Sequence, residues 1–115
     1  MKNFPSLKKN NDFRAVYKSG SSKATPSIVM YVLNNKEGKN RLGVSASRKY
    51  GNSVERHRFA RRMREVFRYY QDVTKQGYDI VIVARNKAKH ISFSSLCGDY
   101  EKLLLSHNIL MDRSE

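Results

Sequence analysis

Residues 48–68 of this 115-residue chain are strongly basic and carry the apolar pattern of an amphipathic helix. Eight of these 21 residues are Arg or Lys, and only Glu55 and Glu65 are acidic. At about 100° per residue, a helix starting near Val54 gathers one apolar stripe: Phe59, Met63, Val66, Phe67 and Tyr70. The other side carries a row of cations: Arg58, Arg61, Arg62, Arg64 and Arg68. One face must therefore pack on another layer, while the self-repelling row predicts a polyanionic partner.

The expected start of this helix resembles an anion site. Gly51 and Asn52 interrupt the preceding element, and either Asn52 or Ser53 can serve as the N-cap. Helix N-termini offer unpaired N–H donors and partial positive charge, which suit a phosphate or carboxylate. Four cations lie close to this point in the sequence: Arg48, Lys49, Arg56 and Arg58.

Three apolar segments predict strands of one sheet. Residues 28–33 and 78–84 are rich in β-branched residues and resemble strands that are buried on both faces. In residues 41–47, apolar side chains alternate with Gly43, Ser45 and Ser47, so one face of that strand is uncrowded. Residues 34–40 read as a turn. Residues 19–27 read as a turn or a short edge strand, because Pro26 cannot donate to a ladder.

Two further helices are expected outside the basic stretch. The first covers about residues 12–18, is capped by Asn10 or Asn11, and places Phe13, Val16 and Tyr17 on one side. The last begins at Ser92 or Ser94 and carries an apolar stripe: Leu96, Tyr100, Leu103 and Leu104. Residues 1–9 are expected to be extended or loose, and residues 108–115 to fray. The fold class is therefore an α/β sandwich of one domain, residues 1–115, with a mixed four-stranded sheet and about three helices.

Composition indicates the class of partner and the cellular location. Lys and Arg number 23 against 10 Asp and Glu, so the formal charge is +13, which points to nucleic acid or an anionic membrane. No apolar run approaches the roughly 20 residues that span a bilayer. The first residues lack the apolar core of a signal peptide. Cys97 stands alone, which excludes an intrachain disulfide and agrees with a cytoplasmic location.

Eight residues of the basic stretch stand at positions that match a known motif. They are Gly51, Asn52, Val54, Arg56, Arg58, Arg61, Arg64 and Glu65. This spacing resembles the Arg-Asn-Arg signature of the protein subunit of bacterial ribonuclease P, roughly K-x-G-N-A-V-x-R-N-R-x-K-R-x-x-R-E. The chain departs from it at His57, where Asn is usual, and at Ala60, where Lys is usual. Residues 7–20 are similar to the family's L-K-x-x-x-D-F-x-x-V-[FY]-x-x-G pattern, and residues 41–49 resemble its strand before the signature.

The resemblance implies a function. In that family the protein joins a catalytic RNA and helps it to remove the 5′ leader of precursor tRNA. The chain would be the accessory subunit of a tRNA-processing endoribonuclease, with Mg²⁺ at the RNA active site and no cofactor or protein partner of its own. A crossover from strand to helix to parallel strand is right-handed in about 98% of cases. The family is known for a left-handed one, so the resemblance implies a left-handed crossover here.

The resemblance also implies two sets of contact residues. The catalytic RNA would be bound by Arg48, Lys49, Asn52, Arg56, His57, Arg58, Arg61, Arg62, Arg64 and Arg68. A cleft between the first helix and the sheet would bind the single-stranded leader through Phe13, Tyr17, Val29, Tyr31 and Ser45. Aromatic side chains beside cations suit unpaired bases. Periodicity alone leaves open whether Phe13 and Tyr17 are cleft or core.

Protein-only catalysis is not expected from this sequence. Metal-dependent phosphodiester cleavage needs clustered carboxylates, and the acidic residues here are few and dispersed. His57, His90 and His107 fall in different segments, and His90 and His107 are expected at the surface. Two other classes remain as alternatives. A structural RNA-binding protein resembling a small ribosomal protein fits the charge equally well. A DNA-binding module would place the Arg helix in a major groove, but the pattern lacks a helix-turn-helix partner.

Overall fold

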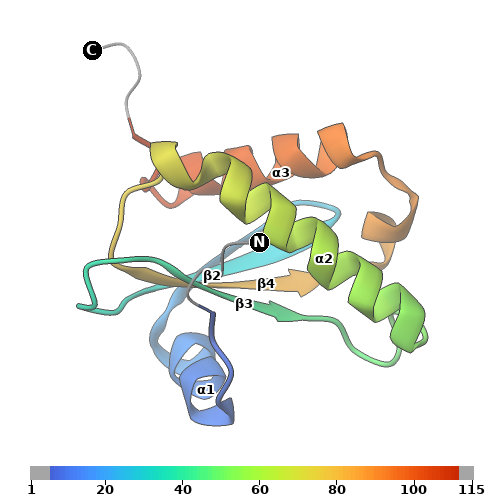
Figure 1. Cartoon of the computed structure of the whole chain (residues 1–115), viewed down its shortest axis with the longest axis horizontal. Coiled ribbons are helices and arrows are strands. Elements are labelled where there is room, and N and C mark those ends of the chain that lie inside the picture. Colours follow the sequence, from blue (N-terminus) through green and yellow to red (C-terminus); the bar gives the residue numbers. More distant parts are fainter. Residues whose placement is uncertain (1–5, 112–115) are drawn as a thin grey trace.

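Helices cover both faces of a four-stranded sheet in the computed structural model, which describes residues 6–111 (Figure 1). In chain order the elements are α1 (Asn10–Ser19), β1 (Ser21–Ala24), β2 (Ile28–Asn34), β3 (Arg41–Ser45), α2 (Ser53–Tyr70), β4 (Tyr78–Ala84) and α3 (Phe93–Ser106). Two short 3₁₀ helices, η1 (Gln71–Val73) and η2 (Asn86–His90), flank β4. Helices α2 and α3 lie on one face of the sheet, and α1 lies on the other.

The sheet is mixed, as the sequence predicts. Its strand order is β1-β2-β4-β3, with β4 antiparallel to β2 and parallel to β3. Residues 19–27 include the edge strand β1, which pairs antiparallel with β2. Strand β3 ends at Ser45, two residues before the expected end. Helix α2 forms the crossover from β3 to the parallel strand β4, and the handedness of that crossover stays a prediction.

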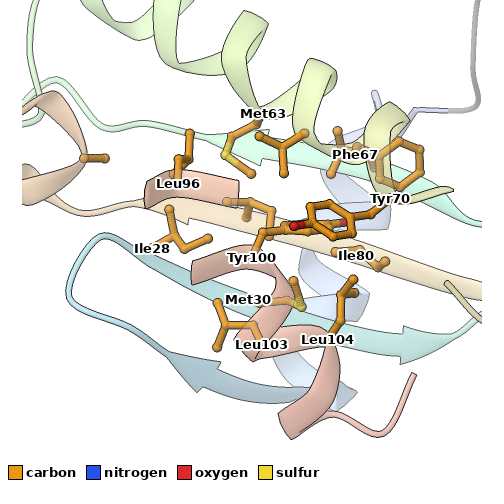
Figure 2. Packing of buried hydrophobic residues seen from close by; sticks show 14 of the residues in the cluster. Ile28, Met30, Met63, Phe67, Tyr70, Ile80, Leu96, Tyr100, Leu103 and Leu104 are labelled. Atoms are coloured by element: carbon orange, nitrogen blue, oxygen red, sulfur yellow. The ribbon is translucent and has the colours of Figure 1, made fainter. Parts of the chain in front are cut away.

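The main core lies between the sheet and helices α2 and α3 (Figure 2). The predicted stripe of α2 is confirmed, because Phe59, Met63, Val66, Phe67 and Tyr70 are all buried. The stripe of α3 is confirmed in the same way for Leu96, Tyr100, Leu103 and Leu104. These side chains meet one face of the sheet, where Ile28, Met30, Ile80 and Ile82 are fully buried. Burial of this apolar surface fixes α2 on the sheet and leaves Arg58, Arg61 and Arg64 exposed on its outer side.

A smaller apolar cluster fills the space under α1. It contains Leu7, Val16 and Val81, with Phe13, Tyr31, Leu33 and Val83 packed against it. The Phe13 ring lies against Gly43, where an added Cβ would meet ring atoms at 2.8 Å. The uncrowded face of β3 is therefore occupied by an aromatic ring from α1, and Gly43 makes that close approach possible.

Two expectations about chain ends and caps are wrong, and a third is confirmed in part. The N-cap of α1 is Lys9 and not Asn10 or Asn11, since the helix starts earlier than its apolar pattern. The segment before α1 is extended, as expected, where Ser6 forms a bridge with Leu42. It is not loose there, because Leu7 is buried and its N–H donates to the carbonyl of Leu42 at 2.9 Å. Residues 108–111 do not fray, because Ile109 is buried and the N–H of Met111 donates to the carbonyl of Val73. Residues 1–5 and 112–115 lie outside the described residues.

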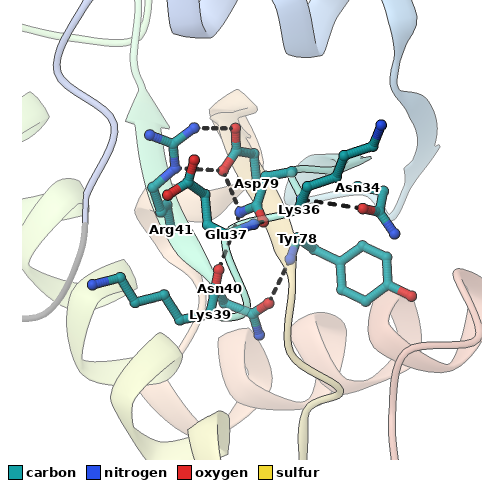
Figure 3. A network of polar contacts seen from close by, with 9 residues as sticks. Asn34, Lys36, Glu37, Lys39, Asn40, Arg41, Tyr78 and Asp79 are labelled. Carbon is teal, nitrogen blue, oxygen red and sulfur yellow. Dashed lines mark hydrogen bonds and ion pairs between the residues drawn. The ribbon is translucent and has the colours of Figure 1, made fainter.

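A polar network holds the turn between β2 and β3 (Figure 3). Arg41 donates from Nε and Nη2 to the two carboxylate oxygens of Asp79, each at 2.7 Å. Asn35 donates to the same carboxylate at 2.8 Å, so this buried charge is well satisfied. The side chain of Asn40 accepts from the N–H of Tyr78 and thereby joins the turn to the start of β4.

Candidate RNA-binding surfaces

The N-terminus of α2 is fixed by a capping box. The Asn52 side chain accepts from the N–H of Glu55 at 2.9 Å, and the Glu55 carboxylate accepts from the N–H of Asn52 at 3.1 Å. Of the two predicted caps, Asn52 is therefore correct and Ser53 is not. The side chain of Asn52 is engaged in this cap while it remains exposed, and Arg48 and Lys49 are exposed just before it.

The Arg-rich face, defined here as Arg58, Arg61 and Arg64, is the exposed part of the predicted row. Within residues 6–111, no carboxylate forms an ion pair with any of these three guanidinium groups. Like charges at this helical spacing destabilise the helix slightly when they stand alone. An anion bound along the face would relieve that repulsion.

Two members of the predicted row have partners in the protein itself. Arg62 donates to the carbonyl of Ala88 at 3.3 Å and to the carbonyl of Ile91 at 2.9 Å. Its guanidinium therefore ties α2 to the segment between β4 and α3. Arg68 forms an ion pair with Glu65 at 2.6 Å. Their predicted RNA contacts remain untested, but neither guanidinium is as available as those of the Arg-rich face.

The remaining predicted residues of α2 line a groove beside β3. The groove has a volume of about 240 Å³ and is lined by Val44, Ala46, Ser53, Arg56, His57, Ala60 and Arg64. The Nε of Arg56 is buried and has no hydrogen-bond partner among the residues that the structure describes. His57 and Ala60, the two residues that depart from the signature, thus both line this groove.

Lys89 is a cation outside the basic stretch that lies near the start of α2. It belongs to η2, and its Nζ lies 5.1 Å from the ring centroid of Tyr50. With Arg58 it lines a small hollow at the start of α2. No helical spacing connects residue 89 with the basic stretch, so only the fold brings this charge to the Arg-rich face.

The predicted leader-binding residues share the other face of the sheet. We call Phe13, Tyr17, Val29, Tyr31 and Ser45 the aromatic face. The rings of Tyr17 and Tyr31 meet edge to face at 4.9 Å, and those of Phe13 and Tyr17 are 6.3 Å apart. Tyr17 is 40% exposed, whereas Phe13 is partly buried against the sheet. The structure thus brings these side chains together as a partly core and partly open surface.

Strand register explains which part of this face is open. Tyr31, Val81 and Gly43 stand in one row across the sheet, and α1 covers that row so that Val81 is fully buried. Val29, Val83 and Ser45 form the next row, and each of these is only partly buried. The second row continues the surface beyond the Tyr17 ring. Exposed Arg14 and Lys18 on α1 add positive charge beside it.

Histidine positions differ in part from expectation. His57 and His90 are exposed, but His107 is partly buried at the end of α3, so its predicted surface position is wrong. Its Nε2 donates to the carbonyl of Met30 at 3.1 Å, and its Nδ1 lies 3.2 Å from the Ser21 hydroxyl. Burial lowers the pKa of His107 below its ordinary value, against a smaller opposing effect of the bond to Met30. This histidine therefore joins α3 to β1 and β2.

The described part of the chain offers no protein metal centre. Across residues 6–111, no three His, Cys, Asp or Glu side chains gather into a possible metal site. Nor does any helix in those residues have the length and apolarity to span a membrane.

Comparisons with known proteins agree with one another. The family profile described as Ribonuclease P matches residues 1–108. The "Ribonuclease P protein component" of Lachnoclostridium phytofermentans is 44% identical over 105 residues, covering 91% of this chain and 90% of the relative. That of Natranaerobius thermophilus is 38% identical and covers 96% of each chain. A solved structure of the Staphylococcus aureus RNase P protein superposes with a TM-score of 0.84 at 35% identity, covering 94% of this chain and 99% of that one.

Proposed function

The chain belongs to the bacterial ribonuclease P protein family, which functions in 5′ processing of tRNA, and on this premise we propose how it binds RNA. Its Arg-rich face binds the catalytic RNA, and its aromatic face binds the single-stranded leader of precursor tRNA. The observation that carries the proposal is the arrangement of these two surfaces. Arg58, Arg61 and Arg64 lie along α2 and form no ion pair within residues 6–111. The aromatic rings lie on the face of the sheet that α1 covers, and Tyr17 is the exposed one among them.

The Arg-rich face suits phosphates rather than bases. Its three guanidinium groups are exposed along one side of a single helix, so they can follow a curved RNA backbone. Each phosphate contact releases condensed counterions, which is the main source of affinity for such a surface. The helix is held rigidly by its buried stripe and its capping box, so binding does not require the helix to fold first.

The aromatic face suits unpaired nucleotides. Stacking of one base on an aromatic side chain contributes about 1–3 kcal/mol and depends little on the base. Tyr17 is the most exposed ring of this face and rests on Tyr31, which holds it in position. A single strand could stack on Tyr17 and continue along the row of Val29 and Ser45.

In this proposal the chain supplies affinity and position, and the catalytic RNA with its Mg²⁺ carries out the cleavage. Across residues 6–111, no group of three His, Cys, Asp or Glu side chains could hold a metal ion, which agrees with this division. Bound Mg²⁺ would neutralise charge in the RNA, and the cations of α2 would add to that neutralisation.

The first experiment mixes the purified chain with ribonuclease P RNA and a precursor tRNA at low Mg²⁺. We expect the chain to stimulate release of the leader, because its cations replace part of the screening that Mg²⁺ provides. A ribosomal or DNA-binding protein would not stimulate the reaction. Absence of stimulation over a full Mg²⁺ titration would contradict the proposed function.

The second experiment measures affinity for the catalytic RNA as a function of salt. If about six phosphates are contacted, the slope of log affinity against log salt should be about −4 to −5. The double variant Arg58→Ala/Arg61→Ala should show a slope less negative by about 1.5. Lys102→Ala, which removes an exposed cation from α3, is the matched control and should leave the slope unchanged. A flat salt response, or equal slopes for all three proteins, would reject phosphate binding by this face.

A further inference from the structure

The groove between α2 and β3 combines apolar and cationic surface in a way that the Arg-rich face does not. Ser53, His57, Ala60 and Arg64 recur at helical spacing and face Val44 and Ala46 of the β3 segment. The apolar side chains Val44, Ala46 and Ala60 provide a surface on which a planar group can rest. No acidic residue is among the lining residues, so the groove favours an anionic occupant.

Arg56 provides the second observation. Its Nε–H is buried, and none of the described residues accepts a hydrogen bond from it. A buried donor without an acceptor is costly, and more so when the donor belongs to a charged group. An oxygen atom of a ligand in the groove would satisfy it. Because Arg56 lies in the first turns of α2, the positive end of the helix also favours a phosphate there.

Strand β3 adds hydrogen-bonding groups at the same place. It is an edge strand, and the carbonyl of Leu42 points away from β4, since it accepts from Leu7. Strand alternation gives the backbone of Val44 the same outward direction. No bridge to Val44 on that side exists within residues 6–111. Val44 can therefore offer one donor and one acceptor to a ligand in the groove.

From these observations we propose that the groove holds one unpaired nucleotide of the bound RNA. Its phosphate pairs with Arg56 and Arg64, and its base rests on Val44, Ala46 and Ala60 beside the free backbone of β3. The assignment rests on the proposed function, because it specifies how the same RNA-binding surface treats one nucleotide.

The position of the groove gives this nucleotide a particular place in the complex. Ser45 faces the aromatic face, whereas its neighbours Val44 and Ala46 line the groove. The two RNA-binding surfaces therefore meet across the edge of β3. A nucleotide in the groove would lie where a strand leaving the aromatic face reaches the cations of α2.

Ala60 lines the apolar part of the groove with a small side chain, so a larger side chain at this position provides the test. In Ala60→Leu a larger side chain fills the apolar part without changing charge or helix propensity greatly. Ala60→Met is a second variant with a more flexible side chain, so it can fill the same space if the branched leucine side chain clashes with its neighbours. Val54→Leu is the matched control, because Val54 is an exposed aliphatic residue of α2 that does not line the groove.

The experiment is an NMR titration of the full chain with adenosine 5′-monophosphate, with inorganic phosphate and with adenosine. We expect the monophosphate to shift the methyl signals of Val44 and Ala60 and the Nε–H signal of Arg56 together. Of these three signals, inorganic phosphate should shift only the Nε–H signal of Arg56. Ala60→Leu and Ala60→Met should weaken monophosphate binding by at least about fivefold while phosphate binding stays constant. Val54→Leu should behave as the unsubstituted chain.

Equal shifts from the monophosphate and phosphate, or no saturable shift of the methyl signals, would overturn the assignment. Unchanged monophosphate affinity in Ala60→Leu would do the same. The two proposals fail separately. A chain that binds the monophosphate as expected but never stimulates leader removal refutes the proposed function, whereas stimulation with a phosphate-only groove refutes the nucleotide site alone.

Discussion

Arg61 and Arg62 are adjacent in α2, yet substitution of each by Ala should affect different properties. Arg61 is exposed, and removal of its side chain should change the free energy of unfolding by no more than about 0.5 kcal/mol. Arg62 donates to the carbonyls of Ala88 and Ile91. Its removal leaves both carbonyls without their donor and releases the segment between β4 and α3 from α2.

The loss of unfolding free energy expected in Arg62→Ala follows from these two hydrogen bonds. A hydrogen bond from a charged donor contributes about 1.5–3 kcal/mol. The bond to Ile91, at 2.9 Å, has good length, but the bond to Ala88, at 3.3 Å, is long, and the side chain is partly exposed. We therefore expect a loss of about 2 kcal/mol in Arg62→Ala. At about 4 °C per kcal/mol for a domain of this size, Tm should fall by about 8 °C.

Thermal melts and RNA titrations on the same proteins check this prediction. Arg61→Ala should keep its Tm and show a salt slope less negative by about 0.7–0.9, whereas Arg62→Ala should show mainly the lower Tm. Arg62→Lys is the control for charge. It keeps the positive charge, but an ammonium group lacks the planar fork with which the guanidinium reaches both carbonyls. It should lose part of the stability. If Arg62→Ala melts within 1 °C of the unsubstituted chain and loses as much RNA affinity as Arg61→Ala, the structural role of Arg62 is wrong.

Three further changes test the other surfaces. His57→Asn should keep leader removal within about threefold near neutral pH, since neutral imidazole and a carboxamide each offer a donor and an acceptor; a larger loss would mean a contact specific to histidine. Tyr17→Ala and Tyr31→Ala should weaken precursor tRNA binding by about 1–3 kcal/mol but leave mature tRNA binding nearly constant, and equal losses for both substrates would make these rings core. Because burial lowers the pKa of His107, the unfolded chain takes up its proton first, so stability should fall as the pH drops below about 6.5. The free energy of unfolding of His107→Gln, measured with urea between pH 5 and pH 7, should lack that part of the pH dependence. If the unsubstituted chain and His107→Gln lose stability in parallel as the pH falls, the role of His107 is wrong.

The sequence predicted the features that one segment determines by itself. The buried stripe of α2 follows from periodicity alone, because a helix of that length has one apolar side. The cap at Asn52 follows from local hydrogen bonding with Glu55. The strands and their mixed pairing were also predicted, since their apolar runs and the crossover helix leave few arrangements.

The features that the sequence did not predict depend on contacts between distant segments. Nothing near Arg62 indicates that its guanidinium reaches the carbonyl of Ile91, which only tertiary packing brings near. His107 is partly buried because it closes against β1 and β2, far away in the sequence. The end of the described chain is held by a single bridge between Thr74 and Leu110 and by the hydrogen bond from Met111 to Val73, and neither contact has a periodic signal. The question of cleft or core at α1 had no local answer either, since Val16 is buried and Tyr17 is exposed on the same side of one helix.

The strand order has a consequence for how the chain is made. Strand β4 lies between β2 and β3, yet it is the last of the four to leave the ribosome. Until it emerges, β2 and β3 have no partner between them, and the apolar side of α2 has no complete sheet to cover. The hydrogen bonds of α2 are local in sequence, whereas the sheet must wait for pairings that are distant in sequence. A nascent chain that ends before residue 78 therefore carries its basic helix into the RNA-rich surroundings of the ribosome before it has a core to hold that helix in place.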